Sequence, residues 1–294
     1  MILKNTFRHR KRAMFYEKIT DDTLRCTLCP KYCLLRNGEI GACKVRSNRN
    51  GIMYSSSYGW IRALNMENIE KIPLVEYYSG MHILSIGSWG CNMNCSICNQ
   101  KQLIDGMGTG RALYPDEVTE IAAKLVDKDC IGIAHSIGEA VVNYEYVYDT
   151  CKAAKRYDLK NVISTNGYIN AKPLEYLLPH VDAVNLDIKS MDMEQYEKWG
   201  GSLETVLESA KLIKEAGVHL EISHVMVPGL SDSKDEISAL SMFIRSELGK
   251  EVPLHLLEHI PYGKAKHIHT PESDLIWAAD VADKYLNSVY IGTP

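Results

Sequence analysis

The chain has 294 residues and a formal net charge of -4, with 46% hydrophobic and 24% charged residues. This balance is typical of a folded globular protein and excludes a disordered or fibrous chain. No apolar run approaches the roughly 20 residues that span a membrane, and the N-terminus has no apolar signal segment. The near-neutral charge argues against general nucleic-acid binding. We therefore expect a cytoplasmic protein with neither a membrane nor a nucleic acid as partner.

Strands and helices are predicted to alternate from residue 81 onward. Short apolar runs predict buried strands at 81–88, 130–134, 161–165, 183–188, 218–227 and 254–260. Apolar residues at helical spacing predict helices from 115, at 144–157, 171–178, 203–216 and 237–248, and at about 272–286. Before residue 81 the pattern is different: 26–50 is expected to be loop, and 51–80 is expected to be irregular.

The alternation predicts an α/β fold with a parallel sheet and right-handed crossovers. Six such strands favour a partial (β/α)6 barrel of the TIM type over residues 81–294, completed by a C-terminal helix and an edge strand at 288–291. Residues 1–80 are expected to form an N-terminal extension that carries a Cys-rich metal site. In TIM-type barrels the chemistry lies at the C-terminal ends of the strands.

Seven of the nine cysteines fall into two tight groups. An odd number in a chain of this length does not indicate a secreted disulfide framework, and the close spacings favour metal or redox chemistry in a reducing compartment. One group, Cys91, Cys95 and Cys98, follows the first barrel strand with the spacing CxxxCxxC. Three thiolates leave one iron of a [4Fe-4S] cluster open for another ligand, whereas structural zinc would need a fourth ligand that this loop lacks.

This motif, in this place, resembles that of the radical S-adenosylmethionine (SAM) superfamily. The runs at 26–48, 69–74, 164–168, 185–189 and 227–232 resemble those of the radical SAM proteins of the AmmeMemoRadiSam system, which are relatives of the pyruvate formate-lyase activating enzymes. The runs 256–259 and 262–266 partly resemble the sixth-strand region of the activating enzymes. The resemblance extends over nearly the whole chain.

The resemblance implies an enzyme in which SAM binds the open iron of the cluster. An electron, delivered by a reductant such as ferredoxin or flavodoxin, cleaves the sulfonium C–S bond. Methionine and a 5′-deoxyadenosyl radical result, and the radical abstracts hydrogen from a substrate. The protein has to align SAM with the substrate and exclude water. No residue is indicated as the catalytic partner of the substrate radical.

Two pairs of residues match the elements by which the family binds SAM. Gly138 and Glu139 match the "GE" element that receives the amino group, and a carboxylate is a suitable acceptor for an ammonium. Asp187 and Lys189 match a D-x-K strand end, where Lys189 would pair with the SAM carboxylate. The alternatives are an ordinary strand-end carboxylate and a structural ion pair at the barrel mouth.

Four further residues are assigned to SAM by the same resemblance. Thr165 and Asn166 are expected on the ribose side, although Asn166 also suits a turn. Ile97 stands where the family often has an aromatic residue near the adenine. His224 stands close to the place of an arginine near the SAM carboxylate, and it equally suits a polar strand end. These departures leave the substrate undefined.

The second cysteine group consists of Cys26, Cys29, Cys33 and Cys43. Four thiols so close in sequence predict a shared metal, because unpaired neighbouring cysteines are vulnerable to oxidation. Zinc, a single iron and an auxiliary iron–sulfur cluster all suit four thiolates. The sequence leaves these three alternatives open.

Several functions remain open at this point. The leading hypothesis is hydrogen abstraction from a protein or peptide, with glycyl-radical-enzyme activation as one form of it. A small-metabolite radical SAM enzyme is the alternative within the superfamily. A structural or electron-transfer protein with iron–sulfur or zinc sites is the non-enzymatic alternative.

Overall fold

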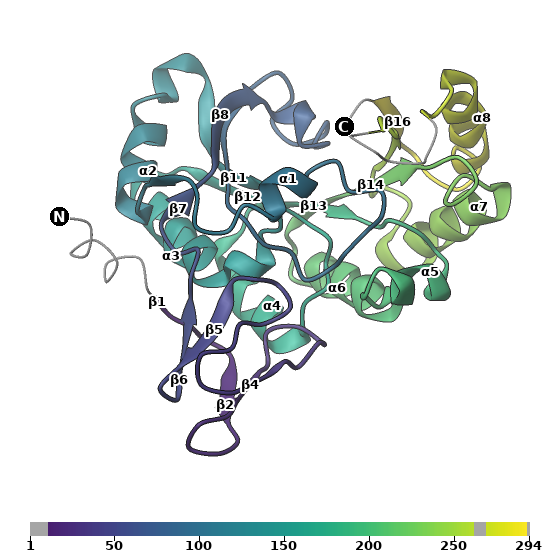
Figure 1. The fold of residues 1–294 in the computed structure, drawn as a ribbon. Coiled ribbons are helices and arrows are strands. Elements are labelled where there is room, and N and C mark those ends of the chain that lie inside the picture. The colour runs from purple at the N-terminus through teal and green to yellow at the C-terminus, as the bar shows by residue number, and fades with distance from the viewer. Residues whose placement is uncertain (1–10, 262–268, 293–294) are drawn as a thin grey trace.

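The computed structural model describes residues 11–261 and 269–292, so the segment 262–266 compared above lies outside the described residues. Eight strands form the main sheet, in the spatial order β16-β15-β14-β13-β12-β11-β9-β8 (Figure 1). Their bounds are β8 Ala63–Asn68, β9 His82–Gly87, β11 Cys130–Ile137, β12 Lys160–Thr165, β13 Ala183–Asp187, β14 His219–Met226, β15 Leu254–Glu258 and β16 Val289–Gly292.

The strands β9 and β11 to β16 run parallel to one another. β8 pairs antiparallel with β9, from Ala63 opposite Gly87 to Asn68 opposite His82. Within the described residues β8 and β16 are the two ends of the strand order and do not pair, so the barrel is open. The predicted partial barrel and its edge strand are therefore confirmed, and β8 is an addition that the sequence did not predict.

Eight α-helices accompany the strands within the described residues: α1 Lys101–Ile104, α2 Pro115–Ala123, α3 Tyr144–Ala154, α4 Ala171–Leu177, α5 Met193–Lys198, α6 Leu203–Glu215, α7 Lys234–Phe243 and α8 Glu272–Ala282. α6 shows how the sequence sets such a helix. The Ser202 side chain caps it by accepting from the Thr205 amide, and Val206, Ala210 and Ile213 form its buried face. None of the described helices is long and apolar enough to cross a membrane.

The residues before β8 form two small antiparallel sheets and part of a third. The strands are β1 Lys11–Arg12, β2 Tyr16–Lys18, β3 Leu24–Cys26, β4 Leu34–Leu35, β5 Arg46–Arg49, β6 Ile52–Ser55 and β7 Trp60–Ile61, the last pairing with β10 Arg111–Ala112. The predictions of loop over 26–50 and of irregular chain over 51–80 were wrong at the strands that fall within those ranges, including β8. Strands of two to four residues are too short to show an alternating pattern in the sequence.

In Figure 1 the purple N-terminal strands form a lobe below the main sheet. Backbone contacts join this lobe to the barrel, because the Asn170 amide at the start of α4 donates to the Leu28 carbonyl at 3.0 Å. Arg46 of β5 also pairs with Glu145 of α3. The division at residue 80 stays a prediction, and β8, on the N-terminal side of that division, belongs to the main sheet.

Candidate active site

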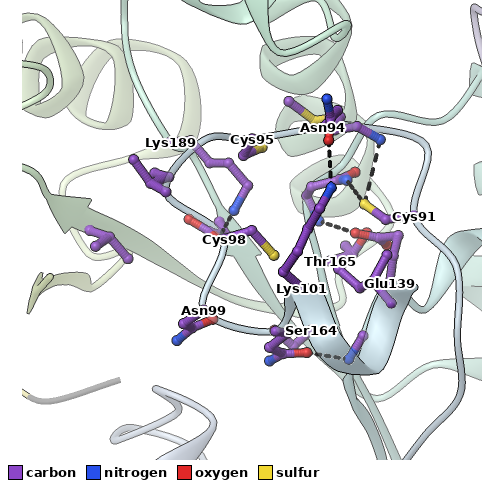
Figure 2. Close-up of a pocket in the computed structure, with 18 of the residues that line it drawn as sticks. Cys91, Asn94, Cys95, Cys98, Asn99, Lys101, Glu139, Ser164, Thr165 and Lys189 are labelled. Carbon is purple, nitrogen blue, oxygen red and sulfur yellow. Dashed lines mark hydrogen bonds and ion pairs between the residues drawn. The ribbon is translucent and has the colours of Figure 1, made fainter. Parts of the chain in front are cut away.

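A pocket lies at the C-terminal ends of the parallel strands (Figure 2). The residues that line it come from the loop after β9, from α1, and from the ends of the strands β11 to β15. They are Cys91, Met93, Asn94, Cys95, Ile97, Cys98, Asn99, Gln100, Lys101, Ile104, Ser136, Gly138, Glu139, Ser164, Thr165, Asn166, Asp187, Lys189, Val225, Glu258, His259 and Ile260. The structure thus brings together all the residues predicted for the cluster and for SAM except His224.

The loop after β9 carries the three cysteines to one side of the pocket. It begins at Gly90, whose φ of +95° is a left-handed conformation that favours glycine. Two donors approach the Cys91 sulfur: the Met93 amide at 3.4 Å and the Asn166 side-chain amide at 3.7 Å. Such donors stabilise a thiolate and tune the potential of a cluster that it holds.

The environment of these thiols disfavours free thiolates. Burial raises the pKa of Cys91 to about 12, and the Glu139 carboxylate adds to this effect. Burial also raises the pKa of Cys95 to about 11, although the Lys189 cation opposes the rise. A bound metal replaces the thiol proton and removes this cost. Within residues 11–261 and 269–292, no three His, Cys, Asp or Glu side chains converge as ligands of one metal ion.

Glu139 is a buried carboxylate fixed by three donors. Its Oε1 accepts from the Thr165 hydroxyl at 2.6 Å and from the Val141 amide at 3.1 Å, and its Oε2 accepts from the Asn166 amide at 3.0 Å. Burial raises the pKa of Glu139, while these hydrogen bonds oppose the rise. Gly138, with φ of +81°, turns the chain at the end of β11 and directs Glu139 into the pocket.

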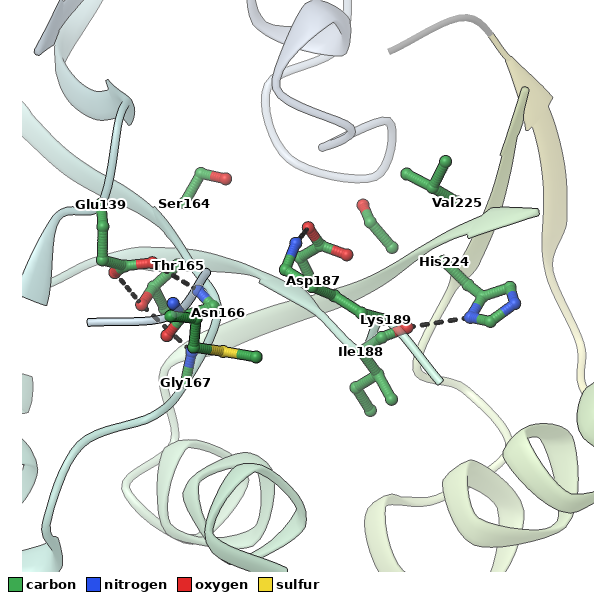
Figure 3. Close-up of polar contacts among 12 residues, drawn as sticks. Glu139, Ser164, Thr165, Asn166, Gly167, Asp187, Ile188, Lys189, His224 and Val225 are labelled. Carbon is green, nitrogen blue, oxygen red and sulfur yellow. Dashed lines mark hydrogen bonds and ion pairs between the residues drawn. The ribbon is translucent and has the colours of Figure 1, made fainter. Parts of the chain in front are cut away.

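Lys189 and Asp187 form an ion pair on another side of the pocket from Glu139 (Figure 3). Burial by itself would lower the pKa of Lys189, but the Asp187 carboxylate raises it above its usual value, so the amine stays charged. The second Asp187 oxygen, Oδ1, is buried and has no hydrogen-bond partner among the described residues. Lys189 lies two residues beyond the end of β13, and the ion pair brings both side chains to the pocket.

Together these groups suit a zwitterionic ligand beside a thiolate-bound cluster. The pocket offers a cation at Lys189 and anionic oxygens at Glu139 and Asp187 Oδ1, which match a carboxylate and an ammonium respectively. SAM carries both groups on its methionine portion. The donor set and the unpartnered oxygen therefore fit a [4Fe-4S] cluster with SAM.

His224 lies outside the pocket. Its ring nitrogens lie 2.8 Å from the carbonyl oxygens of Ile188 and Ser231, away from Glu139 (Figure 3). The next residue, Val225, lines the pocket instead. Because successive side chains of a strand face opposite sides, Val225 and His224 cannot share the pocket face. The expected contact of His224 with the SAM carboxylate is therefore contradicted by its position.

Other residues that line the pocket were not predicted. Ser136, Ser164, Glu258 and Val225 lie at or near the ends of their strands, so the general position of chemistry in such barrels could have identified them. The signal for Gln100 and Lys101 was weaker, because α1 is a single short turn of helix after the cysteine loop. Thr165, expected on the ribose side, lines the pocket and donates its hydroxyl to Glu139.

The four N-terminal cysteines line a second, smaller cavity. Its other residues are Leu28, Lys31, Gly41, Arg46, Asn92 and Val142. Burial raises the pKa of Cys29 to about 12 and also raises the pKa of Cys43. The grouping predicted from the cysteine spacing is therefore present, while the metal at this site stays a prediction.

Residues 86–240 match the family model of the radical SAM superfamily. The chain is 37% identical over 288 residues to an uncharacterized protein of Methanocaldococcus jannaschii. This alignment covers 96% of this chain and 85% of the relative. It is 30% identical over 184 residues to the pyruvate formate-lyase 1-activating enzyme of Escherichia coli. This alignment covers 61% of this chain and 74% of that enzyme.

The fold also resembles solved structures. A radical SAM methyltransferase from Sphaerobacter thermophilus superposes with a TM-score of 0.62 over 99% of this chain and 82% of that chain, at 12% identity. At this level of identity the likeness concerns the fold and not the substrate.

Proposed function

The chain belongs to the radical SAM superfamily, in the branch of the pyruvate formate-lyase-activating enzymes, and from this premise we propose that it reductively cleaves SAM at a [4Fe-4S] cluster held by Cys91, Cys95 and Cys98. The radical that results abstracts hydrogen from a protein or peptide substrate. The observation that carries this proposal is the meeting of the three thiols, the fixed carboxylate of Glu139 and the Lys189 cation around one pocket.

The cluster, when bound, supplies the electron that breaks the sulfonium C–S bond of SAM. This chain's own residues orient the cofactor for that event. Lys189 binds the SAM carboxylate, and Glu139 with the unpartnered oxygen of Asp187 accepts from the SAM ammonium. Because Thr165 and Asn166 hold Glu139 in place, its carboxylate needs little reorganisation when SAM binds.

Two observations support a protein or peptide as substrate. The Escherichia coli relative is named for activating an enzyme, pyruvate formate-lyase. The sheet of this chain is open between β8 and β16 among the described residues, which leaves a side approach to the barrel. We propose a one-electron protein such as ferredoxin or flavodoxin as the reductant and the cytoplasm as the location.

Anaerobic incubation of the reconstituted protein with SAM and dithionite tests the chemistry. We expect release of 5′-deoxyadenosine and methionine, and loss of that release in Cys95→Ala. The matched control is Cys130→Ala, which removes a buried thiol on β11 that is not among the pocket residues. A protein with an intact cluster that forms no 5′-deoxyadenosine would overturn the proposal.

Isotope transfer tests the substrate class. Lysate from cells grown in deuterated medium is separated by size into a protein and peptide fraction and a small-molecule fraction. We expect deuterium to enter 5′-deoxyadenosine only with the first fraction. Transfer from the small-molecule fraction alone would instead establish a metabolite as substrate.

A further inference from the structure

The second cysteine cavity is enclosed by protein on most sides. Cys26, Cys29 and Cys43 are buried, and Cys33 is partly exposed. Its other walls come from the N-terminal lobe and from two residues of the barrel, Asn92 and Val142. The four cysteines therefore line one cavity between the lobe and the barrel.

The spacing of the four thiols separates the kinds of metal site. A tetrahedral single-ion site needs all four sulfurs about 2.3 Å from one metal. Among the described residues, no three His, Cys, Asp or Glu side chains are close enough together to hold one metal ion, although the four cysteines line one cavity. The thiols are therefore spaced for a group larger than a single ion.

A charged donor lies beside one of these sulfurs. The Arg46 guanidinium approaches the Cys26 sulfur at 3.7 Å.

A neutral thiol is a weak acceptor, so this cation stabilises a thiolate far more than a thiol. Positive backbone φ values also occur beside the cysteines. Tyr32 and Lys44, each next to a cysteine, have positive φ values of 42° and 62°. Non-glycine residues keep such conformations only where their surroundings require them, and these are often ligand sites.

We propose that Cys26, Cys29, Cys33 and Cys43 hold a second iron–sulfur cluster rather than a single zinc or iron ion. Four cysteine thiolates are the usual ligand set of a [2Fe-2S] or [4Fe-4S] cluster, and inorganic sulfide supplies the atoms that fill the cavity. This inference does not depend on SAM cleavage, because it concerns thiols that lie outside the SAM pocket.

One residue links the two cysteine sites. Asn92 directly follows Cys91, lines the second cavity and donates its side-chain amide to the Tyr168 carbonyl at 2.6 Å. Its side-chain oxygen accepts from Asn166 at 3.1 Å, and the same Asn166 amide approaches the Cys91 sulfur. Asn92 therefore joins the wall of the second cavity to the hydrogen bonds around Cys91, and it is a positioning residue for both sites.

Sulfide analysis tests the composition of the second site. The full-length variant in which Cys91, Cys95 and Cys98 are all replaced by alanine lacks the ligands of the SAM cluster. We expect this variant, reconstituted anaerobically, to keep about two to four irons and as many acid-labile sulfides per chain. It should lose them when Cys26→Ala and Cys29→Ala are added. One zinc or one iron without sulfide, or no metal at all, would overturn the proposal.

The wild-type protein gives the same answer should the triple variant fail to fold. Two clusters require more sulfide than one, so we expect about six to eight sulfides per chain. About four sulfides together with one zinc would exclude the second cluster. Neither measurement uses 5′-deoxyadenosine, so failure of the proposed SAM chemistry and failure of this inference can be told apart.

The potential of the second cluster tests the role of Asn92. Asn92→Leu removes a polar side chain from the wall of the second cavity, and we expect a lower midpoint potential for the second cluster in the triple-alanine background, because the reduced cluster loses a nearby dipole. The matched control is Asn94→Leu, since Asn94 lies on the same loop and lines the SAM pocket instead. Equal potentials in the two variants would contradict the assigned role.

Discussion

Arg46 and Glu145 form an ion pair whose two side chains are 1% and 0% exposed, and this pair joins the N-terminal lobe to helix α3 of the barrel. The Glu145 carboxylate also accepts from the Met14 amide at 2.8 Å, and the Arg46 guanidinium donates to the Met14 carbonyl at 2.7 Å. The stability of a buried charge depends on its partner, because removal of either residue leaves the other as an unpaired buried charge.

We expect Glu145→Gln to lower the free energy of unfolding by about 3–5 kcal/mol, since the Arg46 cation stays buried without a counter-charge. Replacing both residues, with Arg46→Met and Glu145→Met, should recover part of the loss. Urea denaturation measures both effects. The control is Asp21→Asn, which breaks an exposed ion pair with Lys18 and should leave the unfolding midpoint unchanged. Additive losses in the double variant would refute the pairing.

We expect Glu139→Gln to weaken SAM binding about 10-fold to 100-fold, because the neutral amide loses a charge-assisted hydrogen bond worth about 1.5–3 kcal/mol. The iron content should not change, since Glu139 is not a cluster ligand in this proposal. Equilibrium binding of SAM to the reconstituted protein measures the effect. Glu175→Gln, at an exposed position of α4, is the control. Wild-type affinity in Glu139→Gln would refute the assigned role.

We expect Lys189→Met to weaken SAM binding and also to destabilise the fold by about 1–3 kcal/mol, because Asp187 is left as an unpaired, mostly buried carboxylate. Adding Asp187→Asn should restore stability without restoring SAM affinity. Thermal unfolding and SAM titration, performed on the same two variants, separate the two effects. Recovery of affinity in the double variant would mean that the ion pair is purely structural.

Gly90 is the position where the cysteine loop touches the N-terminal lobe. A Cβ here would lie 2.7 Å from the Cys43 carbonyl oxygen and against the side chain of Val45, at a φ of +95°. We expect Gly90→Ala to cost about 2–4 kcal/mol through crowding and strain. Gly217→Ala, at a φ of +71° with open space around the Cβ, should cost only about 1 kcal/mol. Equal unfolding free energies in these variants would contradict the close contact.

The pH dependence of stability has an identifiable source in Glu221 of β14. His219 and His255 donate to its carboxylate at 2.8 and 2.6 Å, as do the amides of Val75 and Glu76. Burial alone would raise the pKa of Glu221, but the hydrogen bonds lower it to about 2. Its contribution to stability is therefore complete above the unfolded pKa of about 4.3 and is lost as the pH falls toward 2.

We expect Glu221→Gln to be less stable than the wild type by on the order of 3 kcal/mol at neutral pH. The difference should shrink steadily below about pH 4. Urea denaturation of both proteins across this range measures it. Acid loss of metal affects both alike, so their difference isolates Glu221. A difference that stays constant with pH would show that the carboxylate charge is not its cause.

The barrel and its pocket could be predicted because their signals are local. Short apolar runs marked the strands β9 and β11 to β15, and parallel topology then required their C-terminal ends to meet. The position of Glu139 near Asp187 followed from that geometry alone. The roles of these residues toward SAM stay predictions, because they were carried over from a family resemblance.

What could not be predicted depended on pairing between distant segments. β8 pairs with β9 across residues 69–81, and the β8 sequence, ALNMEN, has no strong strand pattern. His224 was misplaced because the position in the motif was matched without its alternation along β14. The sequence did not show which face of β14 lines the pocket; because Val225 is on that face, His224 lies on the opposite one.

The contact between Gly90 and Cys43 has a practical consequence for truncation. The N-terminal lobe cannot be cut away to obtain a minimal barrel, because the loop that carries Cys91 rests on that lobe at Gly90 and Asn92. A shortened chain would also leave Glu145 facing solvent without its guanidinium partner. Excision at residue 80 should therefore yield a protein that binds iron poorly, even though every cysteine of the CxxxCxxC motif is retained.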